Sequence, residues 1–252
     1  MIAVGSLDYA QARMQSRLGR RPSEPVWSAI EHAREFEAVI DLARGTTLAE
    51  ALHDLGEARE VHAVEGRLRL HWRATVEEAA LWMPGRWRAA LRWCAVLPDL
   101  PALHHAASGR AAYDWMRADP IYRELVDEDG VRVPADHALA PLAAALTAPR
   151  ELARAWGREW LRRAGLSGDQ LEDLVPIRRL LAYRLVPAKV VADAGQVRVR
   201  RDLDAGLLAA FRRHAIEPLA AFAYVGLVAL DLERLRGEVT RRLAMPTRSF
   251  AS

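Results

Sequence analysis

Apolar residues recur at steps of three and four positions through most of this 252-residue chain. This spacing places them on one face of an α-helix, whereas a half-buried strand needs strict alternation. In the first half, helices are expected at about 26–45, 47–55, 58–82 and 86–96. In the second half, they are expected at about 135–146, 149–164, 168–184, 202–213 and 217–243. The pattern predicts an all-α fold, a multi-helix bundle of stacked helical units.

Turn-forming residues mark where these helices should end. Pro84-Gly85 breaks the long helix. Thr46 or Thr47 can cap the short helix through Leu55, with Glu50 in capping-box position three residues after Thr47. Only residues 196–200, which alternate between apolar and polar after a glycine, are typical of a strand. The segment is short, and an extended linker is the alternative.

One polar segment divides the chain in two. Residues 127–134 combine acidic residues, a glycine and a proline between helical patterns. We expect an N-terminal helical unit at 1–126 and a C-terminal helical unit at 135–252. One continuous domain is the alternative.

The charge balance limits the classes of partner. The net charge is +3, and Lys189 is the only lysine. The 33 acidic residues are mixed among the arginines, which argues against a nucleic-acid footprint of one sign. The abundance of Ala, Arg and Leu and the absence of Asn are typical of a GC-rich, bacterial genome. Arg abundance alone therefore has no functional meaning here.

The same chain shows no signal for secretion or for a membrane span. The N-terminus lacks a basic segment followed by an apolar one, so no signal peptide is expected. The longest apolar run lies within 218–230, whereas a bilayer span needs roughly twenty residues. We expect a cytoplasmic protein, either free or peripheral at the inner face of the membrane, with no integral segment.

A search for catalytic chemistry yields no constellation. The eight histidines include no pair four residues apart on one helix, and no nucleophile elbow or phosphate-binding loop occurs. Cys94 excludes an internal disulfide and lies in a helical pattern, where a buried apolar role is expected. We therefore expect no enzyme activity and no cofactor. A zinc site or an active site assembled from distant residues stays open as an alternative.

Tryptophan and arginine are interleaved between positions 72 and 93. The set is Trp72, Arg73, Trp82, Arg86, Trp87, Arg88, Arg92 and Trp93. Such residues can stack on and clamp a nucleic-acid single strand. They are also frequent anchors of protein interfaces and ordinary core material. A core or interface role is favoured, and a helical nucleic-acid-binding protein is the alternative function.

Two separated stretches resemble one known family. Tyr9-Ala10-Gln11-Ala12-Arg13, followed by Arg17-Leu18, resembles the opening segment of the C subunit of V/A-type rotary ATPases, called subunit d in eukaryotes. Ile216-Glu217-Pro218 through Tyr224, continued by Asp231, Leu235 and Arg236, resembles the entry to that family's last long helix. Residues 82–91 carry a weaker likeness to an internal helix junction. The family is usually longer, and its acidic residue and Asn on the last helix fall on Ala229 and Arg234.

The resemblance implies a non-catalytic adaptor in a proton- or ion-transporting machine. Family members are helical funnels that sit on the membrane rotor ring and receive the central stalk. The expected partners are accordingly other protein subunits, namely the stalk or the ring. Eight residues are candidates for docking: Arg13, Arg17, Trp82, Arg86, Trp87, Glu217, Tyr224 and Asp231.

Overall fold

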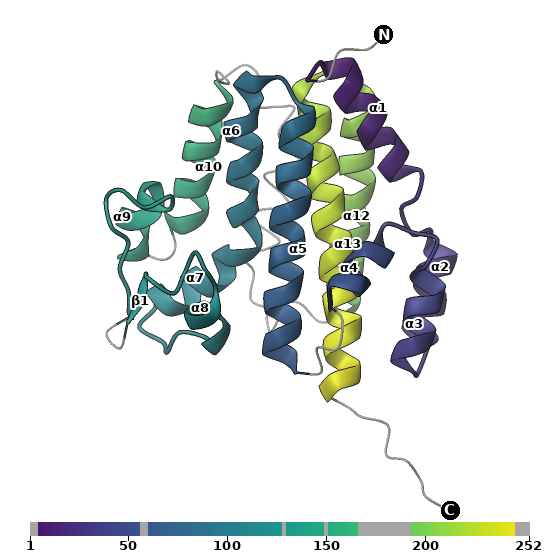
Figure 1. Ribbon diagram of the computed structural model, residues 1–252, viewed down its shortest axis with the longest axis horizontal. Helices are drawn as coiled ribbons and strands as arrows, with labels where there is room; N and C mark the ends of the chain where they lie inside the picture. Colours follow the sequence, from purple (N-terminus) through teal and green to yellow (C-terminus); the bar gives the residue numbers. More distant parts are fainter. Residues whose placement is uncertain (1–4, 56–59, 128–129, 149–150, 166–192, 245–252) are drawn as a thin grey trace, which may run out of the picture.

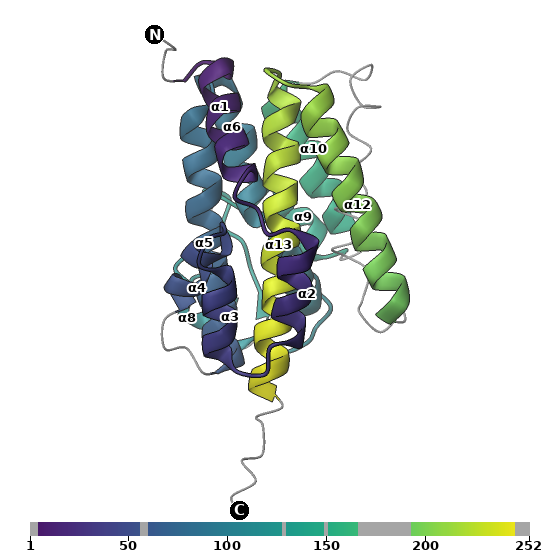
Figure 2. The same cartoon turned by 90° about the vertical axis from the view of Figure 1, so that its right-hand side faces the viewer.

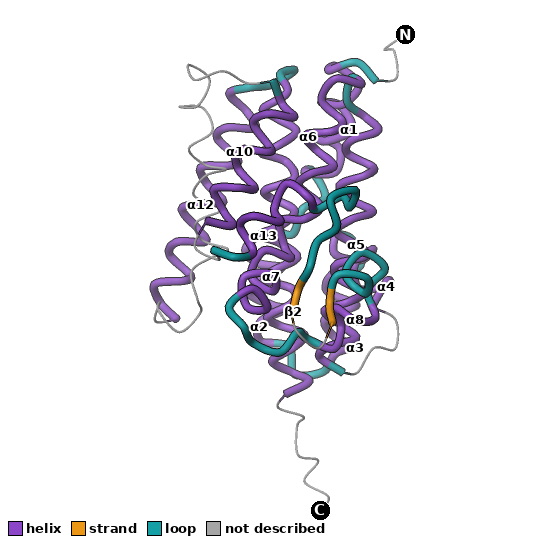
Figure 3. The backbone as a smooth tube through the Cα atoms, turned by 90° about the vertical axis from the view of Figure 1, so that its left-hand side faces the viewer, coloured by secondary structure: helices purple, strands orange, loops and turns teal. Residues whose placement is uncertain are grey.

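The computed structural model describes residues 5–55, 60–127, 130–148, 151–165 and 193–244. Within them the fold is predominantly helical, as the spacing predicts (Figure 1). The helices are α1 (Leu7–Leu18), α2 (Glu24–His32), α3 (Phe36–Ala43), α4 (Leu48–Leu55), α5 (Val61–Trp82), α6 (Gly85–Trp93), α7 (Leu100–Ala107), α8 (Asp114–Ala118), α9 (Ala143–Leu146), α10 (Leu152–Ala164), α12 (Asp193–Arg213) and α13 (Pro218–Ala244). Two 3-10 helices cover Cys94–Asp99 (η1) and Ala140–Leu142 (η2). The strands β1 (Val126–Asp127) and β2 (Gly130–Val131) form a small antiparallel hairpin (Figure 3).

The long helix α13 is the centre of the bundle. It contacts α12, α5, α1, α4 and α6. Every residue from Ala220 to Leu227 is buried, as expected for a helix that is apolar on all sides. Figure 2 shows α13 between α12 on one side and the α5–α6 pair on the other. The short helices α2, α3 and α4 lie beside the lower half of α13 (Figure 1).

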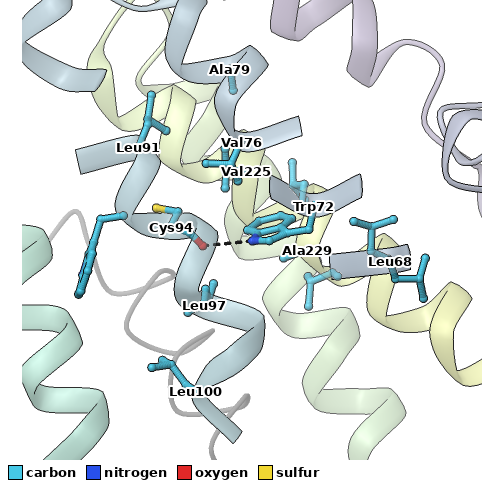
Figure 4. Close-up of a cluster of buried hydrophobic side chains, with 14 of the residues drawn as sticks. Leu68, Trp72, Val76, Ala79, Leu91, Cys94, Leu97, Leu100, Val225 and Ala229 are labelled. Carbon is cyan, nitrogen blue, oxygen red and sulfur yellow. Dashed lines mark hydrogen bonds between the residues drawn. The ribbon is translucent and has the colours of Figure 1, made fainter. Parts of the chain in front are cut away.

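The core between α5, α6 and α13 is built around Trp72 (Figure 4). Its Nε1–H donates to the backbone oxygens of Cys94, at 3.2 Å, and Ala95, at 3.0 Å. A buried indole needs such a partner for its N–H, so this bond fixes the ring against the start of η1. Val76 of α5 and Val225 of α13 complete the cluster. A single set of apolar contacts therefore joins helices from both ends of the sequence.

The expected helix over 26–45 is divided into α2 and α3, which corrects the sequence prediction. Ala33 leaves the helical conformation with φ −63° and ψ 131°. The carbonyls at the end of α2 find donors on α13 instead. Arg242 donates to the backbone oxygens of Ile30 and, at 2.8 Å, Ala33, and Arg241 donates to that of Glu31 at 3.0 Å. Arginine donors can satisfy the free carbonyls of a helix end, so the break is stabilised from about two hundred residues away.

The expected strand at 196–200 is helical, which is a second correction. These residues belong to α12, which begins at Asp193 and not at 202 or 204. Leu203, Leu207 and Phe211 are buried at steps of four, and Val199 is exposed. Arg198 and Val199 therefore lie on the solvent-facing side of an amphipathic helix.

Smaller differences concern helix ends. Thr46 supplies the side-chain acceptor near the start of α4, with its Oγ1 3.2 Å from the backbone nitrogen of Leu48. The capping box of Thr47 and Glu50 is absent because the Glu50 carboxylate binds Arg17 and Arg20. The helix expected over 135–146 is reduced to η2 and α9. The one expected over 168–184 lies outside the described residues.

Helices on the two sides of the 127–134 segment pack on each other. α13 contacts α5, and α10 contacts α6. One cluster of buried apolar residues extends across both halves. The division into two units stays a prediction. Within the described residues, no helix is both long and apolar enough to cross a bilayer.

Candidate functional site

A small pocket lined by both polar and apolar side chains lies where α1, α4, α5 and α13 meet. Its volume is about 40 Å³, compared with the several hundred Å³ of a typical pocket for an organic ligand. The lining residues are Arg17, Thr47, Leu48, Glu50, His71, Thr75, Glu78, Tyr224, Val228, Asp231 and Leu232. Three of the eight docking candidates are therefore part of one site. Its size suits one or two water molecules.

Arg17 binds carboxylates from two other helices at this pocket. Its Nη2 lies 3.0 Å from Oε1 of Glu78 on α5, and its Nη1 binds Glu50 on α4. Burial lowers the pKa of Arg17, but hydrogen bonds and attraction to Glu78 and Glu50 outweigh it, so the pKa is raised. The guanidinium stays charged and ties α1 to α4 and α5.

Two aromatic side chains continue this contact into the core. The rings of Trp82 and Tyr224 lie 6.0 Å apart, and the guanidinium of Arg13 lies 5.3 Å from the centre of the Trp82 ring. Arg13 also approaches Glu78, at 3.7 Å. Burial raises the pKa of the Tyr224 hydroxyl, so it remains protonated near neutral pH.

Asp231 forms the deepest ion pair of the site. Arg21, in the α1–α2 connection, donates from Nε to Oδ2 of Asp231 at 2.6 Å and from Nη2 to Oδ1 at 2.9 Å. The same guanidinium binds Asp204 of α12. Burial raises the pKa of Asp231 to about 6, although the Arg21 charge lowers it. No local pattern predicts that Arg21 and Asp204 meet Asp231, because three distant segments supply this trio.

The eight docking candidates thus fall into two groups. Trp82, Tyr224 and Asp231 are buried, with exposed fractions of 5%, 2% and 6%. They have no surface for direct contact with a partner; they join helices instead. Arg13 and Arg86 are exposed, whereas Arg17 and Trp87 are partly buried.

Glu217, the eighth candidate, lies immediately before α13. Its Oε2 lies 2.9 Å from Nδ1 of His214, and the side chain is 57% exposed. Glu217 therefore presents charge at the surface beside the start of α13.

A second buried network, missed by the sequence analysis, joins α5 to η1 and α8. The Tyr122 hydroxyl donates to Asp99 at 2.5 Å, and Arg73 binds Asp119 at 2.7 Å. Arg69 binds Asp99 and stacks over the Trp115 ring at 3.8 Å. Both carboxylates are matched by guanidinium groups, as burial of charge requires. This network joins the middle of α5 to the ends of η1 and α8.

Cys94 is buried in the core, as expected from its place in a helical pattern. Burial raises the pKa of the Cys94 thiol to about 12, so a thiolate is scarce at neutral pH. The described residues contain no group of three or more side chains arranged to hold a metal ion.

Ile216, between α12 and α13, is a surface residue with an unusual backbone conformation. Its φ is +65°, in the left-handed region that β-branched residues rarely adopt, and its side chain is 49% exposed. The backbone N–H donates to Oε1 of the buried Gln11 of α1, at 3.2 Å. Residues 214–217, α1 and the α5–α6 turn meet at one end of the bundle (Figures 1 and 2). This end is here called the turn end. It carries Arg13, Arg86, Ile216 and Glu217.

Comparison with known proteins adds no family to this picture. No family model, no curated protein and no solved structure matches the chain. The likeness to the rotary-ATPase subunit accordingly continues as a proposal, supported by residues 9–18 and 216–236.

Proposed function

We propose that this chain is a non-catalytic docking protein whose turn end binds another protein subunit. The conformation of Ile216 is the observation on which this proposal depends. A left-handed residue with a β-branched side chain costs about 1–2 kcal/mol, and such strain persists where the surroundings impose it. Here the hydrogen bond from the Ile216 N–H to Oε1 of Gln11 fixes the turn, and the strained residue displays an apolar side chain. An apolar contact ringed by charge is a common form of protein interface.

The charges of the turn end suit such an interface. Arg13, Arg86 and Glu217 are exposed there, so the turn end carries both signs of charge as well as an apolar side chain. Exposed charges of this kind mainly set the choice of partner and the rate of association.

The partner class follows from the sequence resemblance. The two stretches that resemble the C subunit of V/A-type rotary ATPases are α1 and the start of α13. They lie against each other, since Gln11 binds Ile216 and Arg21 binds Asp231. This adjacency supports reading them as one unit, with a central-stalk or rotor-ring subunit as the partner at the cytoplasmic face of the membrane.

The nucleic-acid alternative loses its main support. Trp72, Trp82 and Trp93 are 2%, 5% and 3% exposed, so their rings are not available for stacking on bases. Docking to protein is the function that the surface favours.

Affinity capture of the tagged full chain from its native cells tests the proposal. Ile216→Asn keeps a residue that tolerates the left-handed conformation but removes the apolar side chain. We expect the native chain to retain a rotary-ATPase stalk or rotor subunit, and Ile216→Asn to retain at least tenfold less at unchanged helicity. Charge reversal at Arg13 or Arg86 should also weaken capture without unfolding the chain.

Arg154→Glu is the matched control, because Arg154 is 76% exposed on α10 and should leave capture unchanged. Capture of no ATPase subunit by the native chain would reject the rotary-ATPase assignment. Equal capture by Ile216→Asn would reject the turn end as the docking surface.

A further inference from the structure

The outer face of α5 carries a regular stripe of exposed residues. Leu68, Trp72, Val76 and Ala79 face the core. The opposite side of the same helix presents Ala63, Arg67, Leu70, Ala74, Glu77 and Leu81, here called the outer stripe. Figure 1 looks onto α5, which runs between α6 on one side and α1 and α4 on the other.

The spacing of the outer stripe is that of a helix-pairing seam. Its members follow one another at alternating steps of four and three residues. This is the heptad spacing of positions that meet a second helix in a coiled coil. Leu70 and Leu81 are 50% and 49% exposed, so both side chains are accessible to a second helix along this face. The seam extends over about 27 Å at 1.5 Å per residue.

We propose that the outer stripe binds the outer stripe of a second copy of this chain, with the two α5 helices antiparallel. A two-fold axis at the level of residue 72 places Leu70 opposite Ala74 of the second copy. It also places Arg67 opposite Glu77 of the second copy and Ala63 opposite Leu81 of the second copy. Each contact occurs twice, as a closed symmetric dimer requires.

The charges select this orientation. Arg67 is exposed and has no ion-pair partner among the described residues, whereas Glu77 binds Arg92 at 2.6 Å and 2.8 Å. The hydrogen bond from Arg92 lowers the pKa of Glu77, so its carboxylate is charged, and it retains acceptor sites. The antiparallel register gives the unpaired Arg67 a carboxylate. A parallel register would place Arg67 against Arg67 and Glu77 against Glu77.

The identity of the partner follows from self-complementarity. A face evolved for a different protein needs to complement that protein only, whereas this stripe complements itself in sequence order, charge and side-chain size. Large and small residues alternate across the axis, with Leu70 against Ala74 and Leu81 against Ala63. One short seam buries less area than a standard stable interface, so the dimer is expected to be weak and concentration dependent.

Sedimentation of the full chain over a concentration series tests the dimer. The native chain should shift from monomer to dimer as its concentration rises. Arg67→Glu and Glu77→Arg should each be monomeric, because each creates two like-charged contacts. An equimolar mixture of these two variants should form a heterodimer, because every contact then joins opposite charges. Arg154→Glu, on α10, should dimerise like the native chain.

Cysteine cross-linking tests the register and does not depend on altered charges. Cys94 is buried, so an introduced thiol is the accessible one. Ala63→Cys mixed with Leu81→Cys should form a disulfide-linked dimer under mild oxidation, and Ala63→Cys alone should not. Cross-linking of Ala63→Cys to itself would indicate the parallel pairing and overturn the proposal. A native chain that stays monomeric to about 1 mM, near the weakest affinities of specific association, would also overturn it. Neither result bears on capture of a stalk or rotor subunit by the turn end.

Discussion

Asp231 is a carboxylate that the fold has removed from water. It lies on the central helix α13, is 6% exposed, and is held by the Arg21 guanidinium. Its pKa of about 6 shows that loss of hydration outweighs attraction to Arg21. The side chain therefore links α13 to the α1–α2 connection at some cost in free energy near neutral pH.

Asp231→Asn should change how stability depends on pH. Between about pH 4 and 6 the folded protein binds more protons at Asp231 than the unfolded chain does, because the pKa is raised on folding. The contribution of this residue to stability is present at low pH and is lost as the pH rises through 6. A shift of about two units corresponds to about 3 kcal/mol. The free energy of unfolding of the native chain, relative to Asp231→Asn, should fall by about that amount from pH 4 to pH 7, as measured by urea unfolding.

The matched control for this prediction is Asp41→Asn. Asp41 also pairs with an arginine, Arg44, but its side chain is 68% exposed. It should show no comparable pH-dependent difference. A difference between the native chain and Asp231→Asn that is constant with pH, or that grows toward pH 7, would contradict the assignment.

The end of α2 shows how one element is completed by another. The residues after His32 continue the apolar spacing, but the chain turns at Ala33. Arg242 reaches this end of α2 from α13. Its Nη1 lies 2.8 Å from Oε2 of Glu238, one turn earlier on α13. The arginine side chain is only 9% exposed, so its bonds to the α2 carbonyls are shielded from water. The boundary of α2 is thus a tertiary contact and not a local signal.

Arg242→Met should loosen the end of α2. It keeps much of the apolar stem and removes the donors to Ile30 and Ala33. Loss of buried hydrogen bonds from a charged donor should lower the free energy of unfolding by about 1–3 kcal/mol. Amide hydrogen exchange near residue 33 should become faster.

Arg241→Met provides the comparison, since Arg241 is 51% exposed and makes one bond to this helix end. Its effect on the free energy of unfolding should be below 1 kcal/mol, roughly the value of an exposed interaction. If the two variants were equally stable, Arg242 would not be the cap of α2.

At the scale of the whole molecule, the sequence predicts the long helices well and their partners poorly. The end of α5, the start of α6, the end of α10 and both ends of α13 follow from apolar spacing and from Pro84, Gly85 and Pro218. The helix expected over 86–96 ends at Trp93, where the 3-10 helix η1 begins. The α12 prediction was wrong at residues 196–200 because a short Val–Arg alternation fits either a strand or one side of a helix. Local patterns indicate where a segment can be helical. They do not indicate which distant arginine will bind the free carbonyls at the end of that helix.

The candidate site shows the same limit. The sequence resemblance selected Arg13, Arg17, Trp82, Tyr224 and Asp231, which do lie close together around one pocket and its aromatic neighbours. It could not tell which of them reach the surface, since burial depends on the packing of α1 against α5 and α13. Nor could it find Ile216 as a special position, because a positive φ at isoleucine leaves no mark in composition or spacing.

The most direct test of the docking function is photo-cross-linking from position 216 in native cells. A photoreactive amino acid at Ile216 should join the chain to a stalk or rotor subunit of a rotary ATPase, identified by mass spectrometry. The same group at Arg154, which is 76% exposed on α10, should give no such product. If position 216 yields no protein adduct, or the same adducts as position 154, the turn end is not a docking surface.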